Sequence, residues 1–98
     1  MTTINGMDGL HSPSTLLADG FSLSYSAHDL TRIFTAYGEV VWARVVRDPM
    51  GMSLGFGYVA MASMSEAHAA IEALNGKCLA ERVIQVVHAE APPLPRRA

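Results

Sequence analysis

The octet from Leu54 to Met61 constrains the fold most, because its glycines and aromatic residues alternate as the two faces of a strand require. In a strand, Phe56 and Tyr58 point to one face and Gly57 points to the other. Glycine weakens a strand unless something must approach the backbone closely, so we expect a helix to press against the sheet at Gly57. The two rings are then free either to stack on flat ligands such as nucleobases or to cover each other.

Length and composition limit what this strand can belong to. With 98 residues and 50% hydrophobic content, the chain has material for one compact domain. It has no apolar run of about 18 residues that would span a membrane, and its start lacks the features of a secretion signal. The single cysteine, Cys78, has no second cysteine for a disulfide or a metal site. We therefore expect a cytoplasmic protein with no metal, cofactor or membrane partner.

The charge of the chain argues against a simple electrostatic binder of nucleic acid. Seven Lys and Arg against nine Asp and Glu give a net charge of −2, whereas binding dominated by phosphate contacts usually leaves a basic footprint. Any affinity must therefore come from local chemistry. The basic residues expected in or beside strands are Arg44, Arg47, Lys77 and Arg82.

The pattern of the chain predicts the order strand, helix, strand, strand, helix, strand. Ser26 and Ser63 are favourable N-cap residues for the two helices, which end at Gly38 and Gly76. The expected strands are 15–19, 40–47, 54–61 and 83–89. Residues 1–14 are expected to form a flexible lead-in, residues 15–90 the domain, and residues 91–98 a tail rich in Pro and Arg.

This element order is that of the split βαβ arrangement, an α+β fold of the ferredoxin-like kind, in which two helices cover one face of a four-stranded antiparallel sheet. The second face, which we call the open face, is left without a cover. Alternation predicts that Val41, Ala43 and Val45 point toward the helices. The residues expected on the open face are Leu17, Trp42, Arg44, Val46, Leu54, Phe56, Tyr58, Gln85 and Val87.

Three segments, residues 34–40, 55–59 and 70–76, occur in an order and spacing that resembles the RNA recognition motif family. Within that family the chain resembles the small single-domain glycine-rich or bacterial RNA-binding proteins, over about residues 15–90. The resemblance implies that single-stranded RNA, or single-stranded DNA, binds on the open face. It also implies that bases stack on Phe56 and Tyr58.

The chain departs from the family pattern at three places. Leu54 stands where the family has a Lys or Arg that meets phosphate, Leu17 stands where it has a stacking aromatic residue, and Met61 replaces a buried Phe or Tyr. Stacking is worth about 1–3 kcal/mol per base, so we expect the changes at Leu17 and Leu54 to weaken binding, whereas Met61 affects packing more than binding.

Further contacts are expected around the two rings. Trp42 either extends the stacking surface or folds over the hairpin and shields Leu54 or Val46. Phosphates are expected to meet Arg44 and Arg47, with Lys77 or Arg82 as a further contact, and base edges to meet Gln85. The remaining candidate is His88, at the end of the last strand, which either contacts a nucleotide or is merely solvated.

Two alternatives to RNA binding follow from the same residues. Acylphosphatases share this fold and capture phosphate with an arginine after the first strand, but the segment 19–25 contains neither Arg nor Lys, so we expect no enzyme. The apolar open face would also suit a homodimer or a protein partner. The tail residues 92–97 match a pattern read by proline-binding domains, and Arg96 and Arg97 would equally suit phosphate contacts.

Overall fold

The computed structural model describes residues 14–89. Residues 1–13 of the expected lead-in and the whole expected tail 91–98 lie outside the described residues, whereas Ser14 begins β1. The elements are β1 (Ser14–Asp19), α2 (Ala27–Thr35), β2 (Val40–Arg47), β3 (Ser53–Met61), α3 (Met64–Leu74), β4 (Cys78–Leu79), β5 (Arg82–Val83) and β6 (Gln85–His88). None of the helices in residues 14–89 is long and apolar enough to cross a membrane.

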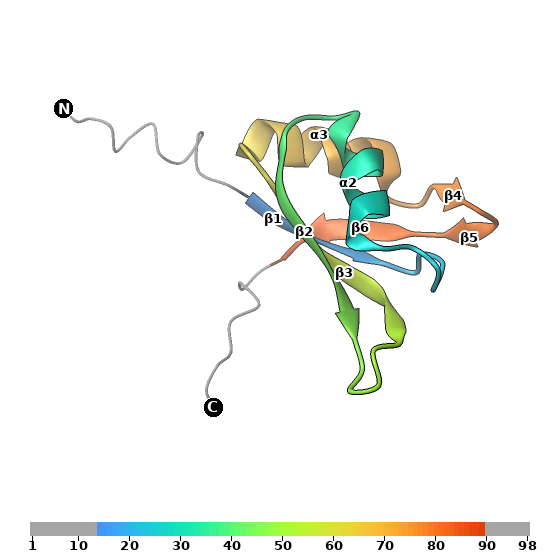
Figure 1. Ribbon diagram of the computed structural model, residues 1–98. Helices are drawn as coiled ribbons and strands as arrows, with labels where there is room; N and C mark the ends of the chain where they lie inside the picture. Colours follow the sequence, from blue (N-terminus) through green and yellow to red (C-terminus); the bar gives the residue numbers. More distant parts are fainter. Residues whose placement is uncertain (1–13, 90–98) are drawn as a thin grey trace.

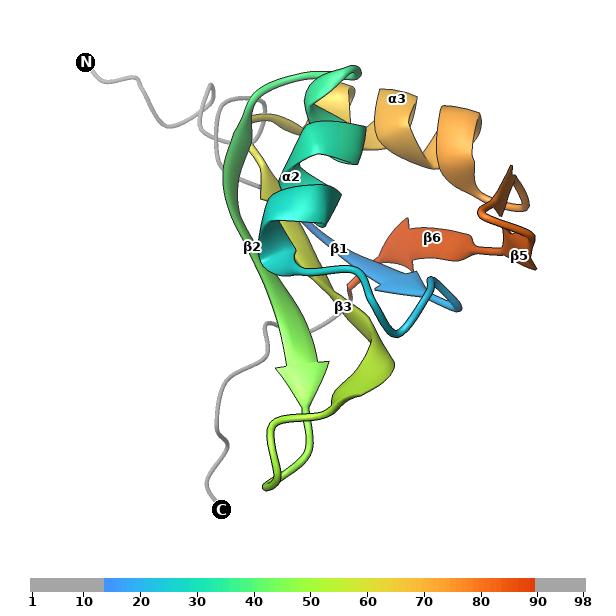
Figure 2. The same ribbon diagram turned by 45° about the vertical axis from the view of Figure 1, so that its right-hand side comes forward.

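The main sheet has four strands in the order β2-β3-β1-β6, and all neighbouring strands are antiparallel. Both α2 and α3 lie on one side of it, and no described element covers the other side (Figure 1). The turned view shows the same two layers, with the β2–β3 hairpin extending beyond the helices (Figure 2). The predicted ferredoxin-like α+β fold is confirmed.

The core lies between the helices and the inner face of the sheet. Removing each large apolar side chain from water stabilises the fold by about 1.5–3 kcal/mol. Because strand side chains alternate, filling the inner positions sends the intervening residues of β1, β3 and β6 to the open face. The buried core consists of Leu16, Ala18, Phe21, Leu30, Phe34, Val45, Val59, Met61, Ala67, Ala70, Leu74, Ile84 and Val86.

Both helices begin where the sequence predicts. The Ser26 backbone N–H donates to the Asp29 carboxylate at 2.8 Å, and the Asp29 N–H donates to Ser26 Oγ at 3.3 Å, which completes a capping box. At α3, the Glu66 N–H donates to Ser63 Oγ at 3.2 Å. These bonds satisfy backbone donors that the first turn of a helix leaves free.

The β2–β3 hairpin is the predicted antiparallel pair, but what approaches Gly57 is not a helix. A Cβ atom at Gly57 would overlap the carbonyl oxygen of Arg44 and lie 3.0 Å from the Cα of Val45. Both atoms belong to the backbone of β2. The prediction of a helix at this point was therefore wrong, and the glycine instead allows the two strands to pack closely.

Val41 does not face the helices, contrary to the alternation expected from the sequence. The register shifts between the pairs Val40↔Met61 and Trp42↔Ala60, so Val41 is the extra residue of a β-bulge. Its side chain is 48% exposed, while Val40 packs against the core in its place. The bulge leaves Trp42 on the open face.

The last strand is shorter than the predicted 83–89, and a small hairpin precedes it. Strands β4 and β5 pair with each other and not with the main sheet. The turn between them consists of Ala80 and Glu81, both with positive φ, 51° and 67°. Ile84, between β5 and β6, and Val86 of β6 are buried as predicted, at 2% and 0% exposure.

Candidate nucleic-acid interface

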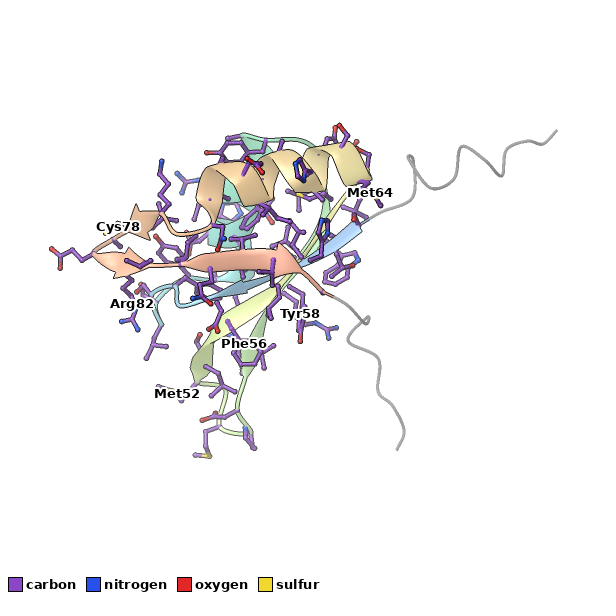
Figure 3. All side chains as sticks on the ribbon, turned by 180° about the vertical axis from the view of Figure 1, so that it is seen from behind. Met52, Phe56, Tyr58, Met64, Cys78 and Arg82 are labelled. Carbon is purple, nitrogen blue, oxygen red and sulfur yellow. The ribbon has the colours of Figure 1, made fainter. Side chains whose placement is uncertain are left out.

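Two aromatic side chains on β3 form the centre of the open face. Phe56 and Tyr58 lie on the face that Figure 3 turns toward the reader. Their ring centroids are 6.5 Å apart and their planes meet at 80°, an edge-to-face contact. Both rings are only half-buried, so each touches the other yet keeps surface that a base can cover.

The register surrounds Tyr58 with a cation and an aliphatic surface. Tyr58 pairs with Arg44 of β2 on one side and with Leu17 of β1 on the other, and Leu17 in turn pairs with Val87 of β6. Arg44 is exposed, and Leu17 is half-buried. A base stacked on Tyr58 would therefore have a guanidinium at the β2 edge and apolar side chains toward β6.

A second row across the sheet passes through Phe56. Phe56 pairs with Asp19, and Asp19 pairs with Gln85 of β6. Both Asp19 and Gln85 are exposed. Gln85 therefore lies where the sequence predicts, whereas Asp19 was not among the predicted contacts although it follows Leu17 by two positions and shares its face.

Trp42 lies at the other end of the open face, beside Ala60. Trp42 pairs with Ala60, which pairs with Thr15 on the opposite side. Ala60 is 1% exposed although it points to the open face, while Trp42 remains 40% exposed. Trp42 and Thr15 therefore cover Ala60, and part of the Trp42 indole stays accessible.

Distance excludes the interpretation in which the indole shields Leu54. Ala60 lies six positions after Leu54 along β3, which is roughly 20 Å of strand. Leu54 is accordingly 49% exposed.

Beyond Phe56 the surface continues as an apolar strip toward the hairpin tip. Leu54 lies in an irregular part of the β2–β3 pairing and is followed outward by Met52, 63% exposed, and Met50, 84% exposed. Figure 3 shows Met52 at this end of the molecule. Arg47 at the end of β2 donates from Nη1 to the carbonyl oxygen of Gly51 at 3.0 Å, so it braces the turn and has other N–H groups for a ligand.

The sequence did not define where the side chains of two candidates, His88 and Arg82, would lie. His88 pairs with Leu16, whose side chain is fully buried under the helices. His88 therefore leaves the sheet on the helix side, away from the other candidates. Arg82 on β5 donates from Nε to the carbonyl oxygen of Gly20 at 3.2 Å, which brings its guanidinium to the end of β1.

The structure offers little for other chemistry. Within residues 14–89, no three side chains of His, Cys, Asp or Glu are grouped as a metal site would require. A hollow of about 300 Å³ lies on the helix layer, lined by Tyr25, Asp29, Arg32 and Ile33. Asp29 is committed there to the helix cap, whose hydrogen bonds from Ser26 lower its pKa. The flat open face is the better candidate because stacking needs no pocket.

The sequence and the fold of this chain have counterparts in known proteins. A family model described as RNA recognition motif matches residues 19–85. The chain belongs to the RNA recognition motif family. The resemblance inferred from the three sequence segments is thereby confirmed.

Members of the RNA recognition motif family with known names or structures match most of the chain. It is 43% identical over 79 residues to glycine-rich RNA-binding protein 3, mitochondrial, of Arabidopsis thaliana, covering 80% of this chain and 26% of that protein. The chain thus spans about a quarter of that relative. A crystal structure of RNA-binding protein PG1 has a TM-score of 0.78 and 32% identity, covering 83% of this chain and 99% of the other. A complex of the Sxl-lethal protein with RNA has a TM-score of 0.77 and 26% identity, covering 83% of this chain and 49% of the other.

Proposed function

We propose that this RNA recognition motif binds short single-stranded RNA on its open face. The observation that carries the proposal is the pair Phe56 and Tyr58, two half-buried rings on a sheet face that no described element covers. Bases of single-stranded RNA stack on such rings because every base has a π-face. The similar Arabidopsis protein is named as RNA-binding and the Sxl-lethal structure contains RNA.

The neighbouring residues divide the remaining tasks. Arg44 beside Tyr58 is placed to meet a phosphate, and Gln85 offers both a donor and an acceptor to a base edge. Trp42 extends the stacking surface at the β2 edge. Leu17 and Leu54 supply apolar contact where relatives of the family carry an aromatic and a basic residue, so the affinity is expected to be modest.

Binding without catalysis is part of the proposal. The open face carries rings, aliphatic side chains, an arginine, a glutamine and an aspartate, which are groups that recognise rather than transform a nucleic acid. The cytoplasmic location expected from the sequence stays a prediction, since the named Arabidopsis relative is a mitochondrial protein. Cell fractionation would check it.

The test is a titration of the nitrogen-15-labelled protein with short mixed-sequence RNA, followed by NMR, for the wild type and for Phe56→Ala with Tyr58→Ala. Each stacked base is worth about 1–3 kcal/mol, so the double variant should lose at least about 30-fold in affinity. Because both side chains point away from the core, its far-ultraviolet circular dichroism should match the wild type. Unchanged binding by the folded double variant would remove the open face from the proposal.

A matched control and a second ligand sharpen the result. Met64 at the start of α3 is 48% exposed on the helix layer, and Met64→Ala should bind as the wild type does. Single-stranded DNA of the same sequence tells whether the 2′-hydroxyl contributes. A silent open face together with the line widths of a dimer would instead support the alternative, association through the apolar strip from Leu54 to Met50.

A further inference from the structure

An acidic side chain lies in the middle of the surface proposed to bind an acidic polymer. Asp19 is the last residue of β1, two positions after Leu17, and is exposed. It pairs with Phe56 on one side and with Gln85 on the other. Directly paired side chains in an antiparallel sheet lie about 4.5–5.5 Å apart at Cβ, so the carboxylate is next to any base that stacks on Phe56.

The described part of the fold, residues 14–89, makes no use of this carboxylate. The other two aspartates of residues 14–89 hold backbone: Asp29 caps α2, and Asp48 Oδ1 accepts from the N–H groups of Met50 and Met52 at 2.9 Å each. By contrast, the hydrogen bonds and ion pairs within the described part of the chain do not involve the carboxylate of Asp19. Residues 14–89 therefore leave its acceptor capacity to a ligand.

A nearby cation offsets the repulsion that this carboxylate would exert on phosphate. The Arg82 guanidinium is held at the end of β1 by the hydrogen bond from Nε to the carbonyl oxygen of Gly20, the residue after Asp19. Figure 3 shows Arg82 at the end of the sheet that lies beyond Phe56. A nucleotide there can set its phosphate toward Arg82 and its base toward Asp19.

We propose that Asp19 selects guanine for the nucleotide stacked on Phe56, an inference that rests on the proposed RNA binding. A carboxylate only accepts hydrogen bonds. Guanine presents two adjacent donors on its Watson–Crick edge, N1–H and N2–H, which match the two carboxylate oxygens. Adenine and cytosine each place an acceptor beside their amino group, and uracil flanks its single N–H with two carbonyl oxygens. The amide of Gln85, next to Asp19, can donate to guanine O6.

The experiment measures Kd by fluorescence anisotropy for labelled oligouridylates that carry one central G, A, C, U or inosine. A good bidentate contact discriminates by about 5- to 100-fold, so the G oligonucleotide should bind tighter than the A, C and U ones by a factor in that range. Inosine lacks only the N2 amino group and should fall between guanine and adenine. This arm tests the contact on the ligand alone.

The protein arm uses Asp19→Asn, with Glu72→Gln as the control. Glu72 lies on α3, its side chain is 70% exposed, and the substitution removes the same charge away from the open face. Asp19→Asn should bring the G oligonucleotide to the affinity of the others and leave the uridine-only oligonucleotide bound equally or more tightly. Glu72→Gln should keep the full preference.

The outcomes separate this inference from the proposed function. Absence of binding to every oligonucleotide would overturn both. Binding of similar strength to all five by the wild type would overturn the role of Asp19 and leave RNA binding standing. A guanine preference that survives in Asp19→Asn, or is insensitive to inosine, would equally contradict a contact between the carboxylate and the N1 and N2 donors.

Discussion

At the scale of single residues, Gly57 determines how closely the two strands beside the open face can pack. A side chain there would collide with the backbone of β2, at Arg44 and Val45, and backbone cannot move aside as a flexible side chain can. The same stretch of β2 carries Arg44, which pairs with Tyr58. The glycine therefore fixes the spacing of the cation and the ring.

Replacing Gly57 by alanine should be costly. Overpacking of this kind destabilises by about 3 kcal/mol, measured as the free energy of unfolding in urea by circular dichroism. Gly51→Ala provides the control, because Gly51 has a φ of +88° but nothing within 4 Å of an added Cβ. The free energy of unfolding of Gly51→Ala should fall by only about 1 kcal/mol, because of backbone strain. Equal losses in the two variants would contradict the close approach at Gly57.

Asp19 shows why part of the candidate site was missed in the sequence although the rule that finds it is simple. Alternation from Leu17 places Asp19 on the open face. The resemblance to the family, however, implies binding roles only for aromatic and basic residues. The register places Phe56, Tyr58, Arg44 and Gln85 on the open face, as alternation predicts, and their roles in binding stay predictions. His88 lies at a strand end, where only the register with Leu16 shows which face it takes.

At the scale of elements, the capping box of α2 gives the stability of the protein a dependence on pH. The hydrogen bond from the Ser26 backbone, followed by the one from its side chain, lowers the pKa of Asp29 from the ordinary value of 3.8. Because the pKa of Asp29 is lower in the folded state, its contribution to stability is complete at pH values above its ordinary pKa. It is lost as the pH falls through the lower, folded-state value.

Asp29→Asn should therefore be less stable than the wild type at pH 7, and the difference should shrink as the pH falls below about 3.8. Urea unfolding curves at a series of pH values would measure this. Ser26→Ala should lose about 1 kcal/mol at neutral pH. A difference between Asp29→Asn and the wild type that does not change with pH would show that the charge of Asp29 has no part in the cap.

The sequence predicts the elements that depend on local signals, and it misses those that depend on contacts between distant residues. Ser26 and Ser63 are recognised because an N-cap acts on a backbone N–H three residues away. The bulge at Val41 depends on its partner strand, which no local pattern records. The β4–β5 turn consists of Ala80 and Glu81, both with positive φ. Turns of this kind usually have the sequence Asn-Gly or Asp-Gly, so this one could not be recognised.

At the scale of the whole molecule, the net charge of −2 leads us to expect that the proposed RNA binding depends mainly on stacking. Contacts from Arg44, Arg47 and Arg82 would neutralise two or three phosphates. The slope of log affinity against log salt should then be about −1 to −2. Anisotropy titrations over a range of KCl concentrations would measure it. A slope steeper than about −3 would contradict binding dominated by stacking.

The fold was predictable because the helix caps, the hairpin turn and the alternation of the strands all support the same arrangement. The two capped helices, the hairpin turn at Asp48 and the buried alternation of β3 and β6 are consistent with one sheet that is covered on one side. The ligand is specified by fewer residues, and these differ from the family pattern at Leu17 and Leu54. Their effect depends on neighbours across the sheet, which only the register identifies.

Trp42 is the single tryptophan of the chain, and its indole is 40% exposed at the edge of the open face. Its partner in the sheet, Ala60, is buried only when β2 and β3 are paired. The emission of this one fluorophore therefore reports two events without any label. Unfolding moves the indole into water and shifts its spectrum to longer wavelength, whereas a base that stacks on it quenches the emission of the folded protein.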